Sequence, residues 1–424
     1  MHSSILDWQL YEGLFTTQAM RHLYSEDSTF AHWLQVEQAL ALCQADLGMI
    51  PAAAAREIAA LRPEQLDRVA IQHATAQVGR PIVSLVSEIS QQVSPAATDW
   101  VHFGATTQDI MDTAAILQLR QALDLLQGQL NSTEAQLLRL TELGQDMPMV
   151  GRTNGQHAQP MTFGLKASVW LQEFRRHQQR LAEVRPRVLS IQLAGAVGTL
   201  SAMGQQGPQL RSSLAARLEL ADCTVHWQNA RDSMAEVMQF IGLVATSVSK
   251  VGKQLNMLAS TEIAEVYEGY QQGAGKSSAM PHKRNQRGSE FAEALGLLAR
   301  QRAGGCYDLC MHEHERSGGA WIMEWVLIPE TLLLGAGALQ ALNTTLEKLQ
   351  LDDERMRQNM ALTGGLIYSE HLVNELAATL GKCEAKRIVE LACAKAQDSG
   401  QSLWSVIERQ PEFVELLNVR KIAP

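Results

Sequence analysis

Long stretches without proline constrain this fold more than any other feature of the sequence. None of the 12 prolines falls within residues 96–147, 209–280 or 330–410, and a proline inside a helix costs about 3 kcal/mol. In two of these stretches apolar residues follow alternating steps of three and four, and Thr133 fills one slot of the first series. Such spacing keeps one apolar seam along a helix and predicts two long helices. The seams consist of Ile116, Leu119, Leu123, Leu126, Leu130, Leu137 and Leu140, and of Ile241, Val244, Val248, Val251, Leu255 and Leu258.

These seams predict an all-α fold with a central bundle of long helices. Such helices would extend about 45 Å at 1.5 Å per residue, more than one compact chain can cover. Continuous seams of this length are typical of bundles shared between subunits, so we expect a homo-oligomer. We expect an N-terminal helical domain at 1–100, a central long-helix bundle domain at 101–345 and a C-terminal helical domain at 346–424.

Charge and composition limit the partners. The 424 residues carry a formal net charge of −9, which argues against a nucleic-acid partner because that needs a basic face. A local group of Lys and Arg can still bind a small anion. The first residues lack the basic segment and apolar run of a signal peptide, and no uncharged apolar stretch reaches the ~18 residues of a membrane helix. Six scattered cysteines are typical of reduced thiols. We expect a cytoplasmic protein with no membrane partner.

Two tempting motifs fail on their spacing. Gly273–Ser278 looks like a phosphate-binding P-loop, but Tyr270 stands where that pattern needs a glycine, and the segment follows a helix rather than a strand. A metal site is disfavoured because two histidines two residues apart do not share a helix face and structural zinc uses paired ligands from separate turns. We therefore expect neither a metal nor a cofactor. The residues considered for this metal site are Cys306, Cys310, His312 and His314.

Three polar clusters remain as candidate sites. Residues 101–109 come directly before the first long helix and residues 151–160 directly after it, whereas residues 273–285 combine glycines, two serines and a basic run. Each cluster places polar donors beside glycine at the end of a rigid element, which is how a polar anion is bound. A helix of about 50 Å separates the first two clusters. They can share one site only if a neighbouring subunit supplies one of them.

Together the clusters resemble the motif regions of the fumarase/aspartase superfamily. Ser277-Ser278-Ala279-Met280-Pro281-His282-Lys283-Arg284-Asn285 is similar to its signature loop, and the segments 106–109 and 151–157 resemble its other two regions. The resemblance covers about residues 15–394. It implies a lyase built as an all-helical three-domain subunit, assembled into a homotetramer whose active sites each draw on three chains.

Within the superfamily, residues 312–325, 79–83 and 185–189 look most like the 3-carboxy-cis,cis-muconate cycloisomerases. This implies anti addition or elimination next to a carboxylate of a small polycarboxylate. Adenylosuccinate lyase, a C–N lyase, is the alternative, but Asn154 stands where its histidine acid would be. A catalytically silent scaffold of the same fold is a third reading, which Lys276 in place of the usual glycine and Gln286 in place of the usual proline would permit.

The resemblance also implies roles for single residues. Ser277 is the base, with its alkoxide stabilised by Lys283 and by backbone donors near Met280, and His157 orients the substrate or donates a proton. Lys283 and Asn285 hold the carboxylate at the reacting carbon. The other expected substrate-binding residues are Thr106, Thr107, Gln108, Thr153, Ser278, Met280 and Arg316.

Overall fold

The computed structural model describes residues 4–269, 273 and 275–410. The chain forms two compact units. The first comprises Met1–Thr133, Phe174–Gly252 and Gly288–Thr344, and the second comprises Glu134–Glu173, Lys253–Arg287 and Thr345–Pro424. Long helices run through both units. The three-domain division expected from the sequence stays a prediction.

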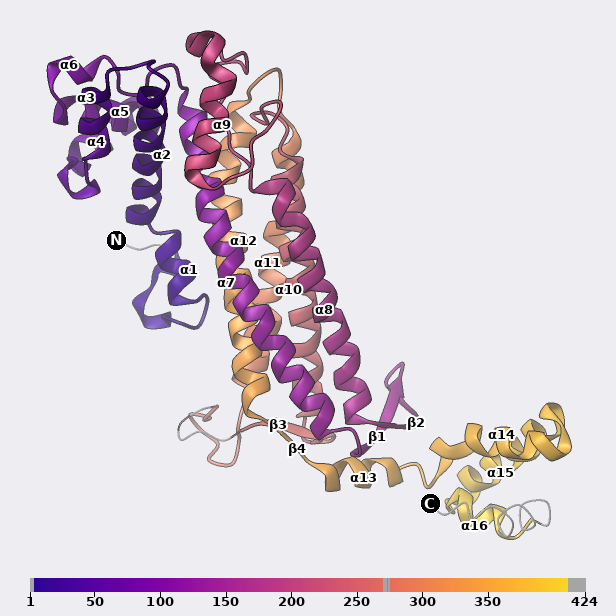
Figure 1. Cartoon of the computed structure of the whole chain (residues 1–424). Helices are drawn as coiled ribbons and strands as arrows, with labels where there is room; N and C mark the ends of the chain where they lie inside the picture. The colour runs from indigo at the N-terminus through magenta and orange to yellow at the C-terminus, as the bar shows by residue number, and fades with distance from the viewer. Residues whose placement is uncertain (1–3, 270–272, 274, 411–424) are drawn as a thin grey trace. The chain divides into compact units, whose positions relative to one another are not determined.

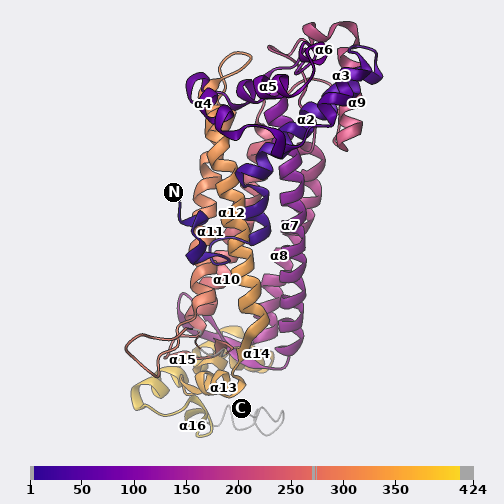
Figure 2. The same ribbon diagram turned by 90° about the vertical axis from the view of Figure 1, so that its left-hand side faces the viewer.

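The predicted long helices are present and dominate the described chain. They are α7 (Thr107–Leu143), α8 (Phe163–Val188), α10 (Asp232–Leu258), α11 (Arg287–Gly305) and α12 (Gly318–Lys348). Within the first unit these helices lie side by side (Figure 1), and the view turned by 90° shows the same arrangement (Figure 2). The all-α prediction is confirmed, and four short strands accompany the helices within the described residues.

Shorter helices complete the first unit. They are α1 (Gln18–Leu23), α2 (Glu26–Asp46), α3 (Ala52–Ala59), α4 (Arg68–Val78), α5 (Pro81–Gln92), α6 (Pro95–Thr98) and α9 (Gly207–Leu218). Their ends carry the expected stop and start signals. Gly79, in the left-handed conformation at φ 74°, ends α4, and Pro81 begins α5, because glycine tolerates that conformation and proline has no N–H to lose at a helix start.

Both predicted seams are buried. Every apolar member of the α7 and α10 series is at most 6% exposed. Thr133, the polar member of the first seam, is also buried, and its hydroxyl donates to Asn343 Oδ1 of α12 at 2.7 Å. Asn343 Nδ2 in turn donates to the Gln129 carbonyl at 3.0 Å. A polar residue is tolerated in the seam because its hydrogen bonds are made inside the bundle.

The second unit contains all four strands. β1 (Pro148–Thr153) and β2 (Gln156–Thr162) form an antiparallel hairpin, and β3 (Val266–Glu268) pairs with β4 (Leu349–Leu351). Its own helices are α13 (Asp353–Ala361), α14 (Ser369–Leu380), α15 (Lys382–Ser399) and α16 (Leu403–Ile407). An apolar core that includes Leu372, Leu376 and Val389 joins α14 to α15.

Two described helices, α10 and α12, are long and apolar enough to cross a membrane. However, 72% and 56% of their most apolar windows are buried inside the protein. Burial against other helices is typical of core helices in a soluble protein, and it accounts for their apolar character.

Candidate active site

The first polar cluster forms the start of α7. Thr106 is the last residue before the helix, and its backbone N–H donates to Asp109 Oδ2 at 3.0 Å. An acid in the first turn thereby satisfies an N–H that a helix start leaves free. Gln108 is buried, and its Nε2 donates to the Gln228 carbonyl at 3.0 Å. Its Oε1 is buried without a partner in the described part of the chain, whereas Thr107 is half-buried.

Asp109, the carboxylate of this cluster, accepts hydrogen bonds from five donor groups. Burial raises its pKa to about 6, although the hydrogen bonds that it accepts act in the opposite direction. A carboxylate in so many bonds joins the start of α7 to two distant parts of the chain, residues 192–195 and Gln228. Its donors are the N–H groups of Thr106, Ala194 and Gly195 and the side-chain amides of Gln192 and Gln228.

Arg316 lies against the same cluster. Its Nη1 donates to Thr106 Oγ1 at 2.8 Å, so the Thr106 hydroxyl holds an arginine rather than capping α7. The structure thus brings together two residues that the sequence assigned independently to substrate binding. Arg316 is exposed, and among residues 4–269, 273 and 275–410 it forms no ion pair with a carboxylate.

One turn further along α7 lies a buried ionic network that the sequence did not predict. Arg231 forms two hydrogen bonds to Asp112, at 2.8 and 2.7 Å, and two to Glu324 of α12, at 2.8 and 3.1 Å. All three side chains are buried. Burial raises the pKa of Glu324; the charge of Arg231 acts in the opposite direction, and that of Asp112 adds to the effect of burial. Asp112 also accepts the indole N–H of Trp321 at 3.1 Å.

The second polar cluster, which the sequence placed directly after the first long helix, forms a β-hairpin. Asn154 and Gly155, at φ 51° and 78°, form a two-residue turn between β1 and β2, the turn for which Asn-Gly is the preferred sequence. Thr153 is exposed at the end of β1. Arg152 forms a bidentate pair with buried Glu265, at 3.0 and 2.7 Å. In this structure Arg152 therefore braces the hairpin.

His157 lies opposite Arg152 in the hairpin register. It is half-buried, and its Nδ1 is buried without a hydrogen-bond partner in the described residues. Burial lowers the pKa of His157, and the nearby Arg152 charge adds to the effect. The imidazole is therefore neutral near pH 7, so one ring nitrogen can accept a proton or hydrogen bond.

The third cluster is an exposed segment that we name the serine loop, Lys276–Asn285. Ser277 Oγ accepts the backbone N–H of Met280 at 3.1 Å and that of Ala279 at 3.4 Å. These are the donors that the sequence placed near Met280. Lys283 is exposed, and its backbone N–H donates to the Met280 carbonyl at 3.1 Å, which closes a turn around Pro281.

Contacts at both ends shape the serine loop. The Asn285 backbone N–H and its Nδ2 both donate to the Gly275 carbonyl, at 2.9 and 3.0 Å. Lys276 pairs with Arg284 in an antiparallel bridge. Gln286 Oε1 accepts the Glu268 N–H at 2.7 Å and so ties the loop to β3. Tyr270 and Ala274 of the rejected P-loop pattern lie outside the described residues.

The expected site residues thus fall into two groups. Thr106, Thr107, Gln108 and Arg316 belong to the first unit, and Thr153, His157, Ser277, Ser278, Met280, Lys283 and Asn285 belong to the second. Sequence reasoning missed Arg231, Asp112, Glu324 and Glu265, because partners about 90 to 120 residues apart leave no local pattern. No three His, Cys, Asp or Glu side chains in the described chain are placed to hold a metal ion. Of the four residues considered for a metal site in the sequence, Cys306 is buried and Cys310 is exposed.

Comparisons with known proteins agree with these motifs. A family profile described as "Lyase" matches residues 13–300. A 3-carboxy-cis,cis-muconate cycloisomerase of Pseudomonas aeruginosa is 39% identical over 403 residues, covering 94% of this chain and 88% of the relative. Trans-aconitate decarboxylase 1 of Mycosarcoma maydis is 35% identical, covering 96% and 82%.

Solved structures with a similar fold also match this chain. The 3-carboxy-cis,cis-muconate lactonizing enzyme of Pseudomonas putida matches with a TM-score of 0.88 and 36% identity, over 96% of this chain and 91% of that one. The profile spans residues 13–300, whereas the two relatives and the solved structure match 94–96% of the chain. This protein therefore belongs to the lyase family of the fumarase/aspartase superfamily.

Proposed function

We propose that this enzyme interconverts 3-carboxy-cis,cis-muconate and its lactone. The observation that carries the proposal is the hydroxyl of Ser277, which accepts two backbone N–H groups in the serine loop. Those donors would stabilise the serine when it carries negative charge. The cycloisomerases among the relatives support the substrate, as does a polar site with exposed Lys283 and Arg316 in a chain of net charge −9.

In the lactonising direction, an oxygen of a substrate carboxylate adds to one carbon of a double bond. The electron pair of that double bond moves towards the neighbouring carboxylate and forms a dianion. Lys283 and Asn285 would hold this dianion, and Ser277 would give its proton to the carbon next to it. In the reverse direction Ser277 takes that proton back. The attack is intramolecular, so the enzyme mainly positions the chain and stabilises charge.

We propose that the remaining donors, Thr106, Thr107, Gln108, Thr153 and Arg316, hold the other carboxylates, and that Ser278 and Met280 line the site in the loop. His157 would orient the substrate or relay a proton with its neutral ring. α7 contains 37 residues, about 55 Å at 1.5 Å per residue. Its two ends carry the first two clusters, which supports a homotetramer whose sites join segments of three subunits. Six free cysteines support a cytoplasmic location.

The test is a direct assay on the purified full-length protein. The ultraviolet absorbance of 3-carboxy-cis,cis-muconate should fall on addition of enzyme, and Ser277→Ala should lower the rate about 10²–10⁴-fold. Ser399→Ala, which removes an exposed hydroxyl at the end of α15, is the matched control and should keep the wild-type rate. Full activity in Ser277→Ala would overturn the role of Ser277. A monomeric mass by light scattering would overturn the shared site.

Release of CO₂ from trans-aconitate is the second candidate, favoured by the similarity to trans-aconitate decarboxylase 1. The assay panel therefore includes trans-aconitate and adenylosuccinate. Turnover of either one, without turnover of the muconate, would replace the proposed substrate. Inactivity on the whole panel of unsaturated di- and tricarboxylates would favour the catalytically silent scaffold.

A further inference from the structure

Arg80 has a fixed backbone and no carboxylate partner. It lies between Gly79, which ends α4, and Pro81, which begins α5. The guanidinium carbon is 5.6 Å from the centroid of the Trp321 ring and 5.8 Å from that of Trp325. Its Nη1 donates to the adjacent Gly79 carbonyl at 3.0 Å. Within the described residues its charge is not neutralised by an acid.

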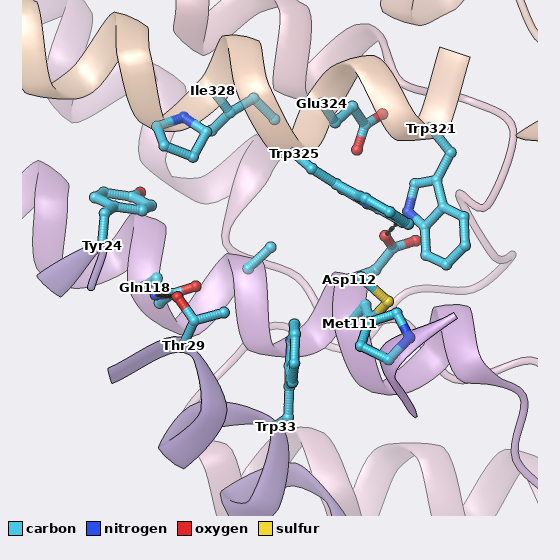
Figure 3. Close-up of a pocket in the computed structure, with 13 residues that line it drawn as sticks. Tyr24, Thr29, Trp33, Met111, Asp112, Gln118, Trp321, Glu324, Trp325 and Ile328 are labelled. Carbon is cyan, nitrogen blue, oxygen red and sulfur yellow. Dashed lines mark hydrogen bonds between the residues drawn. The ribbon is translucent and has the colours of Figure 1, made fainter. Parts of the chain in front are cut away.

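The two tryptophans that support Arg80 are themselves held in place. Their rings meet edge to face, with centroids 5.2 Å apart and planes at 77°. Trp321 is buried and donates its indole N–H to Asp112 at 3.1 Å, as Figure 3 shows, and Asp112 is bound by Arg231. The orientation of Arg80 therefore derives from a buried network, so its guanidinium is preorganised.

Arg80 also lies close to the start of α12. A Cβ atom built on Gly318 would be 3.6 Å from Arg80 Nη2, so a side chain at this position would cover the end of the guanidinium. Arg316, which donates to the Thr106 hydroxyl, precedes Gly318 by two residues. Two arginines without acidic partners in the described chain thus flank one helix start. Backbone N–H groups there add partial positive charge.

A cavity of about 330 Å³, within the range of ligand pockets, adjoins Arg80, because Pro81 and the two tryptophans that support Arg80 line it. Trp321 and Trp325 of α12 line one side, and Trp33 of α2 and Met111 of α7 line another (Figure 3). Met111 lies one helical turn after Thr107, so the cavity continues the face of α7 that carries the expected substrate-binding residues. Its aromatic walls suit a planar unsaturated carbon chain, and the two acids that also line it, Asp112 and Glu324, are both bound by Arg231.

We propose that Arg80 is a substrate-binding residue that, together with Arg316, holds the carboxylate by which a tricarboxylate differs from a dicarboxylate. The inference rests on the proposed function in that it assigns a role within the same site. A merely structural role, joining α5 to α12 through the two tryptophans, is the competing explanation. The two roles differ in one measurable respect. A binding role changes the preference for tricarboxylates, whereas a structural role affects stability and all ligands alike.

The probes are tricarballylate and glutarate, which carry three and two carboxylates and undergo no elimination or lactonisation, so binding is separated from turnover. Calorimetry on the intact full-length protein should show that Arg80→Gln weakens tricarballylate binding about 10- to 100-fold, the usual size of a charge-assisted hydrogen-bond pair. Glutarate binding should change less than about threefold, and Arg80→Lys should recover part of the loss.

Arg68 provides the matched control. Its guanidinium also stacks on a ring, 3.7 Å from the centroid of Phe30, but it is paired with Asp27 at 3.1 Å. Arg68→Gln should leave both affinities unchanged. Unchanged tricarballylate binding in Arg80→Gln would overturn the inference, as would an equal loss for both probes with a lowered melting temperature. If tricarballylate binding depends on Arg80 but the muconate is not turned over, the proposed substrate fails and the inference stands.

Discussion

The start of α7 and the serine loop, which carry the expected site residues, are held in place by different kinds of contact. The start of α7, from Thr106 to Asp112, is mostly buried and is bound to residues that lie far away in the sequence, among them Gly195, Gln228 and Arg231. The serine loop is mostly exposed, and hydrogen bonds within it join near neighbours such as Ser277 and Met280. The first arrangement suits rigid anchoring of substrate, whereas the second suits a segment that adjusts around it.

This contrast makes a general prediction. Substitutions at the start of α7 should mainly cost stability, because they break long-range buried bonds. Substitutions in the serine loop should mainly cost activity, because few buried contacts depend on the loop. The experiments below test each side of this contrast.

The largest effect is expected for Arg231→Met. The change leaves Asp112 and Glu324 buried without their common cation, and removing one partner of a buried ion pair typically costs about 3–5 kcal/mol. Urea unfolding at a fixed protein concentration should show a loss of this size in the free energy of unfolding. Arg316→Met, which removes an exposed arginine that donates to the Thr106 hydroxyl, should cost less than about 1 kcal/mol. Equal losses would contradict the contrast.

A pH-dependent effect is expected at Asp109. Its pKa is raised by burial from 3.8 to about 6, so between these values the folded protein keeps a proton that the unfolded chain releases. The resulting stabilisation is complete below pH 3.8 and is lost as the pH rises through 6. At roughly 1.4 kcal/mol per pKa unit, the stability of the wild type relative to Asp109→Asn should fall by on the order of 3 kcal/mol from pH 4 to pH 7.

Urea unfolding of both proteins at several pH values measures this difference, and all groups other than Asp109 cancel in it. A relative stability that rises with pH would mean that the five hydrogen bonds outweigh burial. Asp109 would then be a charged anchor at every pH at which the protein is folded.

The same contrast explains what the sequence could predict. The seams of α7 and α10 follow from local spacing, and the serine loop and Thr106 follow from local motifs. The hairpin at 148–162 was missed although its Asn154-Gly155 turn is a local signal, because its polar residues were interpreted only as donors for a polar anion. The network of Arg231, Asp112 and Glu324 could not be predicted, because only the packing of α7, α10 and α12 brings these residues together.

The structure shows what the two residues that depart from the family pattern, Lys276 and Gln286, do in the serine loop. Gln286 stands where a proline is usual, and its side chain accepts the N–H of Glu268 in β3. Lys276 stands where a glycine is usual, and it continues the backbone pairing with Arg284. Both residues therefore take part in shaping the serine loop. That is compatible with an active enzyme and weakens the case for a silent scaffold.

The smallest effect on stability is expected for a substitution at Gly275. It tests the prediction that changes in the serine loop mainly cost activity. A Cβ atom at Gly275 would collide with the backbone of Asn285, and the residue has a φ of +65°. Gly275→Ala should displace Asn285 and lower kcat/KM about tenfold, because small misplacements of a positioned group are costly. The free energy of unfolding should fall by no more than about 1–2 kcal/mol.

Gly273→Ala separates the collision from the backbone strain. Gly273 has a similar positive φ of +88°, but a Cβ atom there meets no atom of the described residues within 4 Å. Both variants therefore carry the same kind of conformational cost, and only Gly275→Ala disturbs Asn285. Steady-state assays should show that Gly273→Ala lowers kcat/KM less than about threefold. The larger loss in Gly275→Ala then follows from the collision alone. If the two variants lose equal activity, the position of Asn285 is not what Gly275 protects, and the loop acts through its backbone flexibility instead.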